Sequence, residues 1–153
     1  MNKTVLFCDD EPNILRPTEY ALQRDGLNVI CTVDGEEAWE KFLTLRPDLL
    51  VTDWQMPRLD GLQLVERVRG HSVRCDLPVI MVSARSEELQ RSERAQRLQL
   101  AAVIAKPFSP RELNRCIEQI IEVGAQTITQ RDTNRFQNMK PNHFKDNQDE
   151  FGL

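Results

Sequence analysis

Short apolar runs alternate with longer stretches of helical spacing over residues 1–123. The apolar runs are rich in β-branched residues and cover residues 5–8, 29–32, 49–52, 79–82 and 103–105. Each is followed by about ten or more residues whose apolar positions recur at helical spacing. Because the runs are apolar on both faces, the pattern predicts an open doubly wound α/β fold, with a parallel sheet covered by helices. Right-handed crossovers then place the loop after every strand at one edge of the sheet.

Local signals mark where the predicted helices begin and end. Pro12 follows an acidic pair that can cap a helix, Asp34 opens the next helix, and Ser109 stands before a proline as an N-cap residue does. The last helix is expected to end near Gly124. These boundaries agree with the alternation of strands and helices.

The composition changes beyond Gly124. Residues 124–153 are rich in Gln, Asn, Asp, Thr and Lys and have neither a strand period nor a helix period. We therefore expect one folded domain over residues 1–123 and a polar, disordered tail over residues 124–153. Such a tail is too short for an independently folded effector, so a transcription-factor output is not expected. A short docking motif for a partner protein stays open as the alternative.

Composition and charge limit the class of protein. The chain has 153 residues, of which 40% are hydrophobic and 29% are charged, and its formal net charge is −4. This size suits one well-buried core, and the acidic balance excludes a nucleic-acid binder. The sequence lacks an apolar run long enough to cross a membrane, and its N-terminus becomes acidic before a signal-peptide core could form. We therefore expect a cytoplasmic protein.

Carboxylates follow two of the predicted strands directly. Asp9 and Asp10 follow the first strand, and Asp53 follows the third. If these strands are adjacent, the three carboxylates repel one another unless something neutralises them. Helix capping alone can explain an isolated acidic pair, but two acidic loops at one edge favour a hard cation with oxygen ligands. Magnesium suits best, because it accepts one or two carboxylates and leaves room for a phosphate oxygen.

Two further strand ends offer partners for a phosphoryl group. Ser83 follows the fourth predicted strand and Lys106 follows the fifth, so a hydroxyl and an ammonium reach the same edge. A phosphoryl group in transfer spreads negative charge over its oxygens, which a metal ion, a lysine and hydrogen-bond donors stabilise. Taken singly, Ser83 is explained as a strand-end cap and Lys106 as a solvated charge. Together with the carboxylates they favour phosphoryl chemistry.

Four motifs carry a resemblance to a known family. They are FCDDEPN, VTDWQMPRLDG, MVSA and AKPF. Over residues 3–123 the chain resembles the response-regulator receiver family of two-component signalling, in its stand-alone, single-domain form. The resemblance implies a flavodoxin-like (βα)5 fold with strand order 2-1-3-4-5. It also implies a phosphoacceptor that assists its own phosphorylation and dephosphorylation, not an enzyme acting on other molecules.

The resemblance assigns roles in phosphoryl transfer and metal binding. Asp53 becomes the nucleophile that forms an aspartyl phosphate. Asp10, Asp53 and the backbone carbonyl of Gln55 coordinate Mg²⁺, and Asp9 acts beside or behind the ion.

The same resemblance assigns the residues that contact the phosphoryl group. Lys106 contacts a phosphate oxygen and Ser83 offers its hydroxyl, while small Ala84 leaves the backbone accessible. The bond between Lys106 and Pro107 is implied to be cis, which aims the lysine inward.

The chain departs from the family pattern at two positions. Val103 stands where the family usually has the aromatic residue that rotates in the output face, so an aromatic gate is not expected. Gln99 stands where a glycine is usual, so the turn into the fifth strand must be built differently. The family also has two positions beside the phosphate that affect how long the phosphate persists. In this chain they are Gln55 and Arg85, both with long polar side chains.

Other classes of protein remain as alternatives. A flavodoxin-type flavin binder needs a small-residue phosphate loop where this chain has carboxylates. A phosphatase of the aspartyl-phosphate type usually has a second acid two residues after the nucleophile, where this chain has Gln55. A pseudo-receiver that binds partners without being phosphorylated is the main alternative, although such domains tend to lack one of the acidic or lysine positions.

The resemblance also implies the partners. The phosphodonor is a sensor histidine kinase or a histidine phosphotransfer protein, and the output is a protein target, with neither nucleic acid nor membrane involved. A shuttle in a phosphorelay and a phosphate sink are the other outputs considered. Arg91, Arg94 and Arg97 recur every three residues on a predicted fourth helix, where the family often places its output surface.

Overall fold

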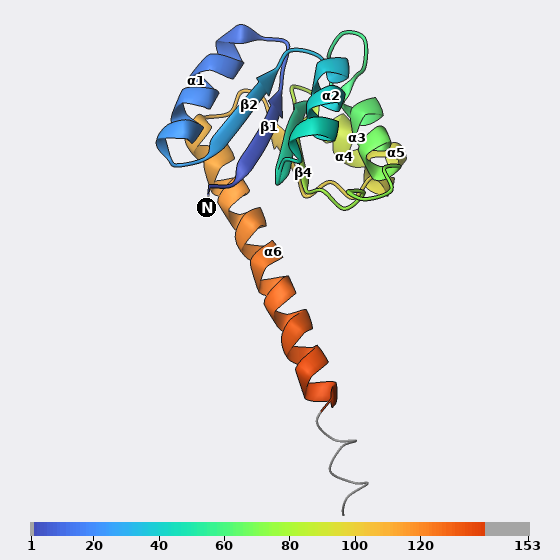
Figure 1. Ribbon diagram of the computed structural model, residues 1–153. Helices are drawn as coiled ribbons and strands as arrows, with labels where there is room; N and C mark the ends of the chain where they lie inside the picture. The colour runs from blue at the N-terminus through green and yellow to red at the C-terminus, as the bar shows by residue number, and fades with distance from the viewer. Residues whose placement is uncertain (1, 140–153) are drawn as a thin grey trace, which may run out of the picture. The chain divides into compact units, whose positions relative to one another are not determined.

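The structure is a computed structural model that describes residues 2–139. Within these residues one parallel sheet has the order β2-β1-β3-β4-β5 (Figure 1), which confirms the predicted fold and strand order. Its strands begin and end within one residue of the predicted runs: β1 (Thr4–Cys8), β2 (Asn28–Thr32), β3 (Leu49–Asp53), β4 (Val79–Ser83) and β5 (Ala102–Ala105).

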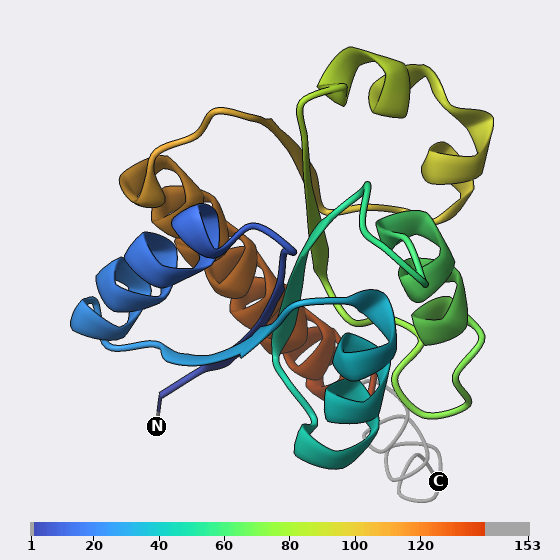
Figure 2. The same ribbon diagram turned by 90° about the horizontal axis from the view of Figure 1, so that it is seen from above.

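Helices cover both faces of the sheet. They are α1 (Pro12–Arg24), α2 (Gly35–Leu45), α3 (Gly61–Arg69), α4 (Ser86–Arg91), α5 (Glu93–Arg97) and α6 (Pro110–Met139). One face carries α1 and the first turns of α6, up to Ile117, and the other carries α2, α3 and the α4–α5 segment (Figure 1 and Figure 2). Every residue of β3 and β4 is buried, as the apolar runs predict for central strands.

Capping side chains fix the start of α2 and α6. Helix α1 begins at Pro12 as predicted, where the missing N–H costs nothing, but its N-cap residue Glu11 makes no side-chain cap hydrogen bond, so the expected acidic cap is wrong. The Asp34 side chain accepts a hydrogen bond from the Glu37 backbone N–H at 2.9 Å, and the Ser109 hydroxyl accepts one from the Glu112 N–H at 3.1 Å. The predicted helix starts are therefore confirmed.

The segment after β4 differs from the prediction. Instead of one fourth helix it forms α4 and α5, separated at Ser92, whose hydroxyl accepts a hydrogen bond from the Ala95 N–H at 3.2 Å. The three arginines therefore do not share a helix. The predicted stripe along a single fourth helix is therefore wrong, and Arg94 is paired with Glu66 of α3.

The turn into β5 forms with Gln99 at the position where the family usually has a glycine. Gln99 itself adopts a left-handed conformation with φ of 53°, a strained choice for a residue with a Cβ. The Arg69 guanidinium lies beside this turn and donates hydrogen bonds to the carbonyls of Leu98 at 2.8 Å and Leu77 at 2.6 Å. Arg69 thus ties the turn to the end of α3 and to the segment before β4.

The last helix is longer than expected. It was predicted to end near Gly124 and continues to Met139. A first compact unit of the chain ends at Ile117, and a second begins at Glu118. The predicted boundary at residue 123 stays a prediction, and residues 140–153 of the expected tail lie outside the described residues. None of the described helices is both long and apolar enough to span a membrane.

A glycine at the start of α3 fixes the loop after β3. The Gly61 N–H donates a hydrogen bond to the Trp54 carbonyl at 2.7 Å. A Cβ on Gly61 would overlap the carbonyl oxygen of Asp53, so this position excludes any side chain. The close approach of the two backbones holds the end of β3 in place.

We predict that Gly61→Ala lowers the free energy of unfolding by about 3 kcal/mol, because the added methyl group forces Asp53 and its loop to move. Gly70→Ala is the control, since its Cβ would lie 3.5 Å from the nearest atom, the Glu66 carbonyl oxygen. That variant should stay within about 1 kcal/mol of the wild type. Urea unfolding of both variants provides the measurement, and equal stabilities would contradict the close approach.

Candidate functional site

Acidic side chains from the loops after β1 and β3 converge at one edge of the sheet. Because β1 and β3 are neighbours, the residues after them are brought together as predicted. Carboxylate oxygens of Asp9, Asp10, Glu11 and Asp53 all lie within 4.8 Å of one another. Asp9 is fully buried and Asp53 is 5% exposed, whereas Asp10 and Glu11 are exposed. The group therefore combines two buried carboxylates with two at its solvent side.

Lys106 reaches into this acidic group from the end of β5. Its Nζ lies 2.9 Å from Asp53 Oδ2, 3.0 Å from Asp9 Oδ2 and 3.3 Å from Glu11 Oε1. The Lys106 backbone N–H donates to the Ser83 carbonyl at 3.0 Å, which fixes the lysine to the end of β4. The expected cis bond between Lys106 and Pro107 is confirmed.

Burial and ion pairing shift the pKa values of these groups in a consistent way. Burial raises the pKa of Asp53 and of Asp9, and the ammonium of Lys106 offsets only part of that rise. Burial by itself lowers the pKa of Lys106, but its ion pairs with Asp53 and Asp9 carry the pKa above its ordinary value. Lys106 is therefore charged at neutral pH, and one positive charge faces several carboxylates.

This imbalance of charge suits a divalent cation. Carboxylate oxygens are ligands that Mg²⁺ prefers, and a second cation would relieve the repulsion that Lys106 leaves. The acidic group can thus hold a metal ion. The Gln55 backbone lies in the loop that the hydrogen bond between Gly61 and Trp54 holds against the end of β3.

Ser83 and Ala84 lie at the end of β4, beside the strand that carries Asp53. Ser83 is 2% exposed, and its Oγ accepts a hydrogen bond from the Arg85 N–H at 2.9 Å. The hydroxyl hydrogen stays available to a ligand, because the oxygen acts only as an acceptor in this contact. Ala84 is exposed.

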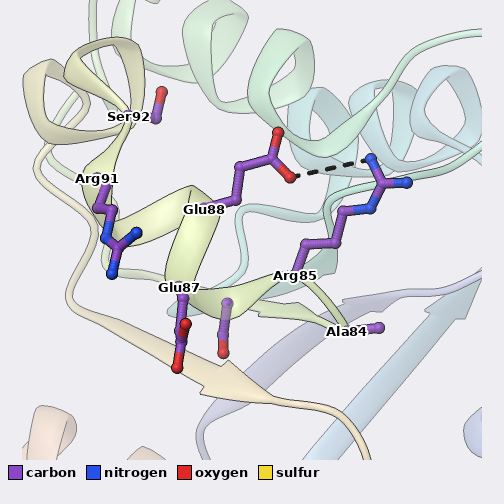
Figure 3. Close-up of a pocket in the computed structure, with 7 residues that line it drawn as sticks. Ala84, Arg85, Glu87, Glu88, Arg91 and Ser92 are labelled. Carbon is purple, nitrogen blue, oxygen red and sulfur yellow. Dashed lines mark ion pairs between the residues drawn. The ribbon is translucent and has the colours of Figure 1, made fainter.

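A pocket opens directly after Ala84. It has a volume of about 700 Å³ and is lined by Ala84, Arg85, Ser86, Glu87, Glu88, Arg91 and Ser92 (Figure 3). The Arg85 guanidinium extends toward the Glu88 carboxylate, 3.9 Å away, and both side chains are well exposed. Arg85, the N-cap residue of α4, therefore pairs with a residue of the helix that it precedes. The Gln55 side chain is exposed as well.

Glu11 belongs to the site although it was not predicted as a site residue. It stands directly after the two aspartates in the first motif, so the run of three acidic residues was the available signal. Its contact with Lys106 joins residues 95 positions apart in the chain. Sequence spacing alone does not predict such a contact.

Comparison with known proteins gives a consistent result. The family model described as "Response regulator receiver domain" matches residues 5–118. The "Alkaline phosphatase synthesis transcriptional regulatory protein PhoP" of Bacillus subtilis is 39% identical over 123 residues, covering 79% of this chain and 49% of that protein. The "Phosphate regulon transcriptional regulatory protein PhoB" of Pseudomonas aeruginosa is 34% identical over 115 residues, covering 74% and 49%. The chain thus spans about half the length of these relatives.

Solved structures agree with the fold. The chemotaxis response regulator CheY4 of Vibrio cholerae has a TM-score of 0.73 at 26% identity, covering 78% of this chain and 99% of that chain. A CheY-like receiver domain protein from Methanospirillum hungatei has a TM-score of 0.76 at 25% identity, covering 83% and 99%.

We predict that Lys106→Met lowers the free energy of unfolding by about 2 kcal/mol at pH 8, because it leaves buried carboxylates without their cation. The loss should shrink as the pH falls toward 4. Burial raises the pKa of both carboxyl groups above the ordinary 3.8 in the folded wild type, and removing the Lys106 ammonium, which lowers these pKa values, raises them further. The folded variant therefore binds more protons than the folded wild type as the pH falls, and it regains stability relative to the wild type. The raised pKa of Lys106 lies above this range and adds no slope within it.

Urea unfolding of the wild type, Lys106→Met and the exposed control Lys3→Met between pH 4 and pH 8 measures this effect. Lys3→Met should match the wild type throughout. A loss in Lys106→Met that does not change with pH would contradict the role of Lys106 as the neutralising charge.

Proposed function

The chain belongs to the response regulator receiver domain family of two-component signalling, and from that membership we propose that Asp53 accepts a phosphoryl group from a phosphohistidine donor. The contact between Asp53 Oδ2 and Lys106 Nζ, at 2.9 Å, is the observation that carries the assignment. It places a nearly buried carboxylate beside the ammonium that an incoming phosphoryl group needs.

The transfer is a displacement at phosphorus. A carboxylate oxygen of Asp53 forms a bond to phosphorus while the bond from phosphorus to the donor's histidine nitrogen breaks. The imidazole leaves with the electron pair of that bond. Lys106 stabilises the charge that develops on the phosphoryl oxygens, and Ser83 donates its hydroxyl hydrogen to one of them.

The acidic group supplies the ligands for the magnesium ion. Asp10 and Asp53 of this group are proposed ligands, together with the Gln55 backbone carbonyl that the family resemblance implies, and Asp9 would act beside or behind the ion. When bound there, Mg²⁺ would supply positive charge that neutralises the phosphoryl oxygens. The exposed Asp10 offers an oxygen at the solvent side of the group, whereas Asp9 is committed to Lys106 and to the Glu11 N–H.

Phosphorylation is proposed to act through the loop after β4. When the Ser83 hydroxyl donates to a phosphoryl oxygen, Ala84 and Arg85 must follow it, because the Arg85 N–H is bonded to the same oxygen. Helix α4 begins at the next residue, so the movement reaches the pocket shown in Figure 3. This route requires no aromatic side chain at Val103.

The proposed partners follow from the same role. A sensor histidine kinase or a histidine phosphotransfer protein supplies the phosphoryl group, and a protein target reads the result. The relatives named above are transcriptional regulatory proteins, but the acidic residues 1–123 are not proposed to bind nucleic acid. A pseudo-receiver is not favoured, because the acidic, hydroxyl and lysine positions are all present and converge.

We predict that phosphoramidate and Mg²⁺ together label the wild type but not Asp53→Asn, which keeps the shape of the side chain and loses the attacking oxygen. Mass spectrometry of the intact chain measures the label, and hydroxylamine should remove it, as expected for an acyl phosphate. Asp60→Asn is the matched control. Its side chain caps α3 by accepting from the Gln63 N–H, which an amide oxygen can also do, so it should be labelled like the wild type.

Two outcomes would contradict the assignment. One is equal labelling of Asp53→Asn and the wild type. The other is a label that resists hydroxylamine, since a phosphate on a hydroxyl group would behave in that way.

A further inference from the structure

Three carboxylates surround the Lys106 ammonium in this structure. The ammonium donates hydrogen bonds to Asp53 Oδ2 at 2.9 Å and to Glu11 Oε1 at 3.3 Å. Asp9 Oδ2 lies 3.0 Å from Nζ as an ion pair, without a hydrogen bond. An arriving phosphoryl oxygen therefore competes with these carboxylates for the ammonium.

The Glu11 side chain contacts Lys106 and does not cap α1. Glu11 is the N-cap residue of α1, where a side-chain oxygen commonly accepts a hydrogen bond from the first turn, yet its side chain makes no such bond. Its backbone N–H is fixed by Asp9 Oδ1 at 2.9 Å. The carboxylate thus extends over the acidic site while its backbone is held in place.

Of the three contacts, the one to Glu11 can open at the least cost. The Glu11 side chain is 58% exposed, whereas the Asp9 side chain is 0% exposed and the Asp53 side chain 7% exposed. A withdrawn Glu11 carboxylate is hydrated by water, but Asp9 Oδ2 would stay buried without any partner charge if it moved away from Lys106. Asp53 cannot withdraw because it is the attacking group.

We propose that Glu11 is a positioning residue that gates Lys106: it occupies one ammonium N–H until the phosphoryl group arrives, and so slows phosphorylation of Asp53. This inference rests on the proposed function of Asp53. In the gated step an Asp53 oxygen bonds to phosphorus, the bond from phosphorus to the donor nitrogen breaks, and the nitrogen leaves with the electron pair. Glu11 forms no bond in this step and acts only by releasing Lys106.

The test compares rates of labelling by phosphoramidate at saturating Mg²⁺. Glu11→Ala removes the carboxylate without removing a helix cap, because the wild-type side chain provides none. Glu11→Asp keeps the negative charge, but its shorter side chain does not reach Lys106 and can instead cap α1. Both variants should be labelled about fivefold faster than the wild type, as expected when one charge-assisted contact no longer competes.

Glu40→Ala is the control for loss of an acidic residue, since Glu40 is exposed on α2, away from the acidic group. It should be labelled at the wild-type rate. A rate for Glu11→Ala equal to or below that of the wild type would overturn the proposal. So would a fast Glu11→Ala with a Glu11→Asp at the wild-type rate, because charge repulsion, not the Lys106 contact, would then control the rate.

A second measurement tests the Glu11 contact with Lys106 and does not depend on phosphoryl transfer. Exchange of the Lys106 ammonium hydrogens with water, followed by NMR, should be severalfold faster in Glu11→Ala because one N–H has lost its acceptor. Equal exchange in the two proteins would overturn the proposal. If the wild type takes no label, the proposed function of Asp53 fails, and the exchange rates alone decide whether Glu11 holds Lys106.

Discussion

The contact of one ammonium group with three carboxylates is the interaction on which this site depends. Asp9 follows β1, Asp53 ends β3 and Lys106 follows β5, so the contact exists only if these strands lie in the order that the sheet has. Each residue is placed by the end of a buried strand, and strand ends move little. The acidic edge is therefore held in place by the sheet before any ligand binds.

The burial of two carboxylates at this edge is unfavourable for stability, and Lys106 offsets only part of the cost. Burial raises the pKa of Asp9 and Asp53, and Lys106 neutralises them only in part, so the folded protein keeps repulsion that the core must offset. A divalent cation and a phosphoryl group complement this arrangement, because the cation supplies the missing positive charge and the phosphoryl group competes for the ammonium. The carboxylate repulsion that costs stability in the folded protein thus favours binding of the cation.

Sequence reasoning located strands and helix caps because these depend on neighbouring residues. Apolar runs marked every strand, and Asp34 and Ser109 cap the helices that they were expected to cap. It missed the break at Ser92, whose hydroxyl caps a helix inside a stretch of helical spacing. It also missed the Glu11 contact with Lys106, which depends on tertiary structure. The polar residues after Gly124 lack an apolar period, so the length of α6 was not predictable from the pattern.

Magnesium binding tests most directly whether the acidic edge is built for a cation. Trp54 follows Asp53, and Trp39 lies on α2 stacked against Phe42, so Trp39→Phe leaves Trp54 as the reporter of the site. Millimolar Mg²⁺ at constant ionic strength should change the Trp54 emission of this variant in a saturable way, and adding Asp10→Asn should weaken the binding. Emission that is indifferent to magnesium, or binding that is unchanged by Asp10→Asn, would contradict the account.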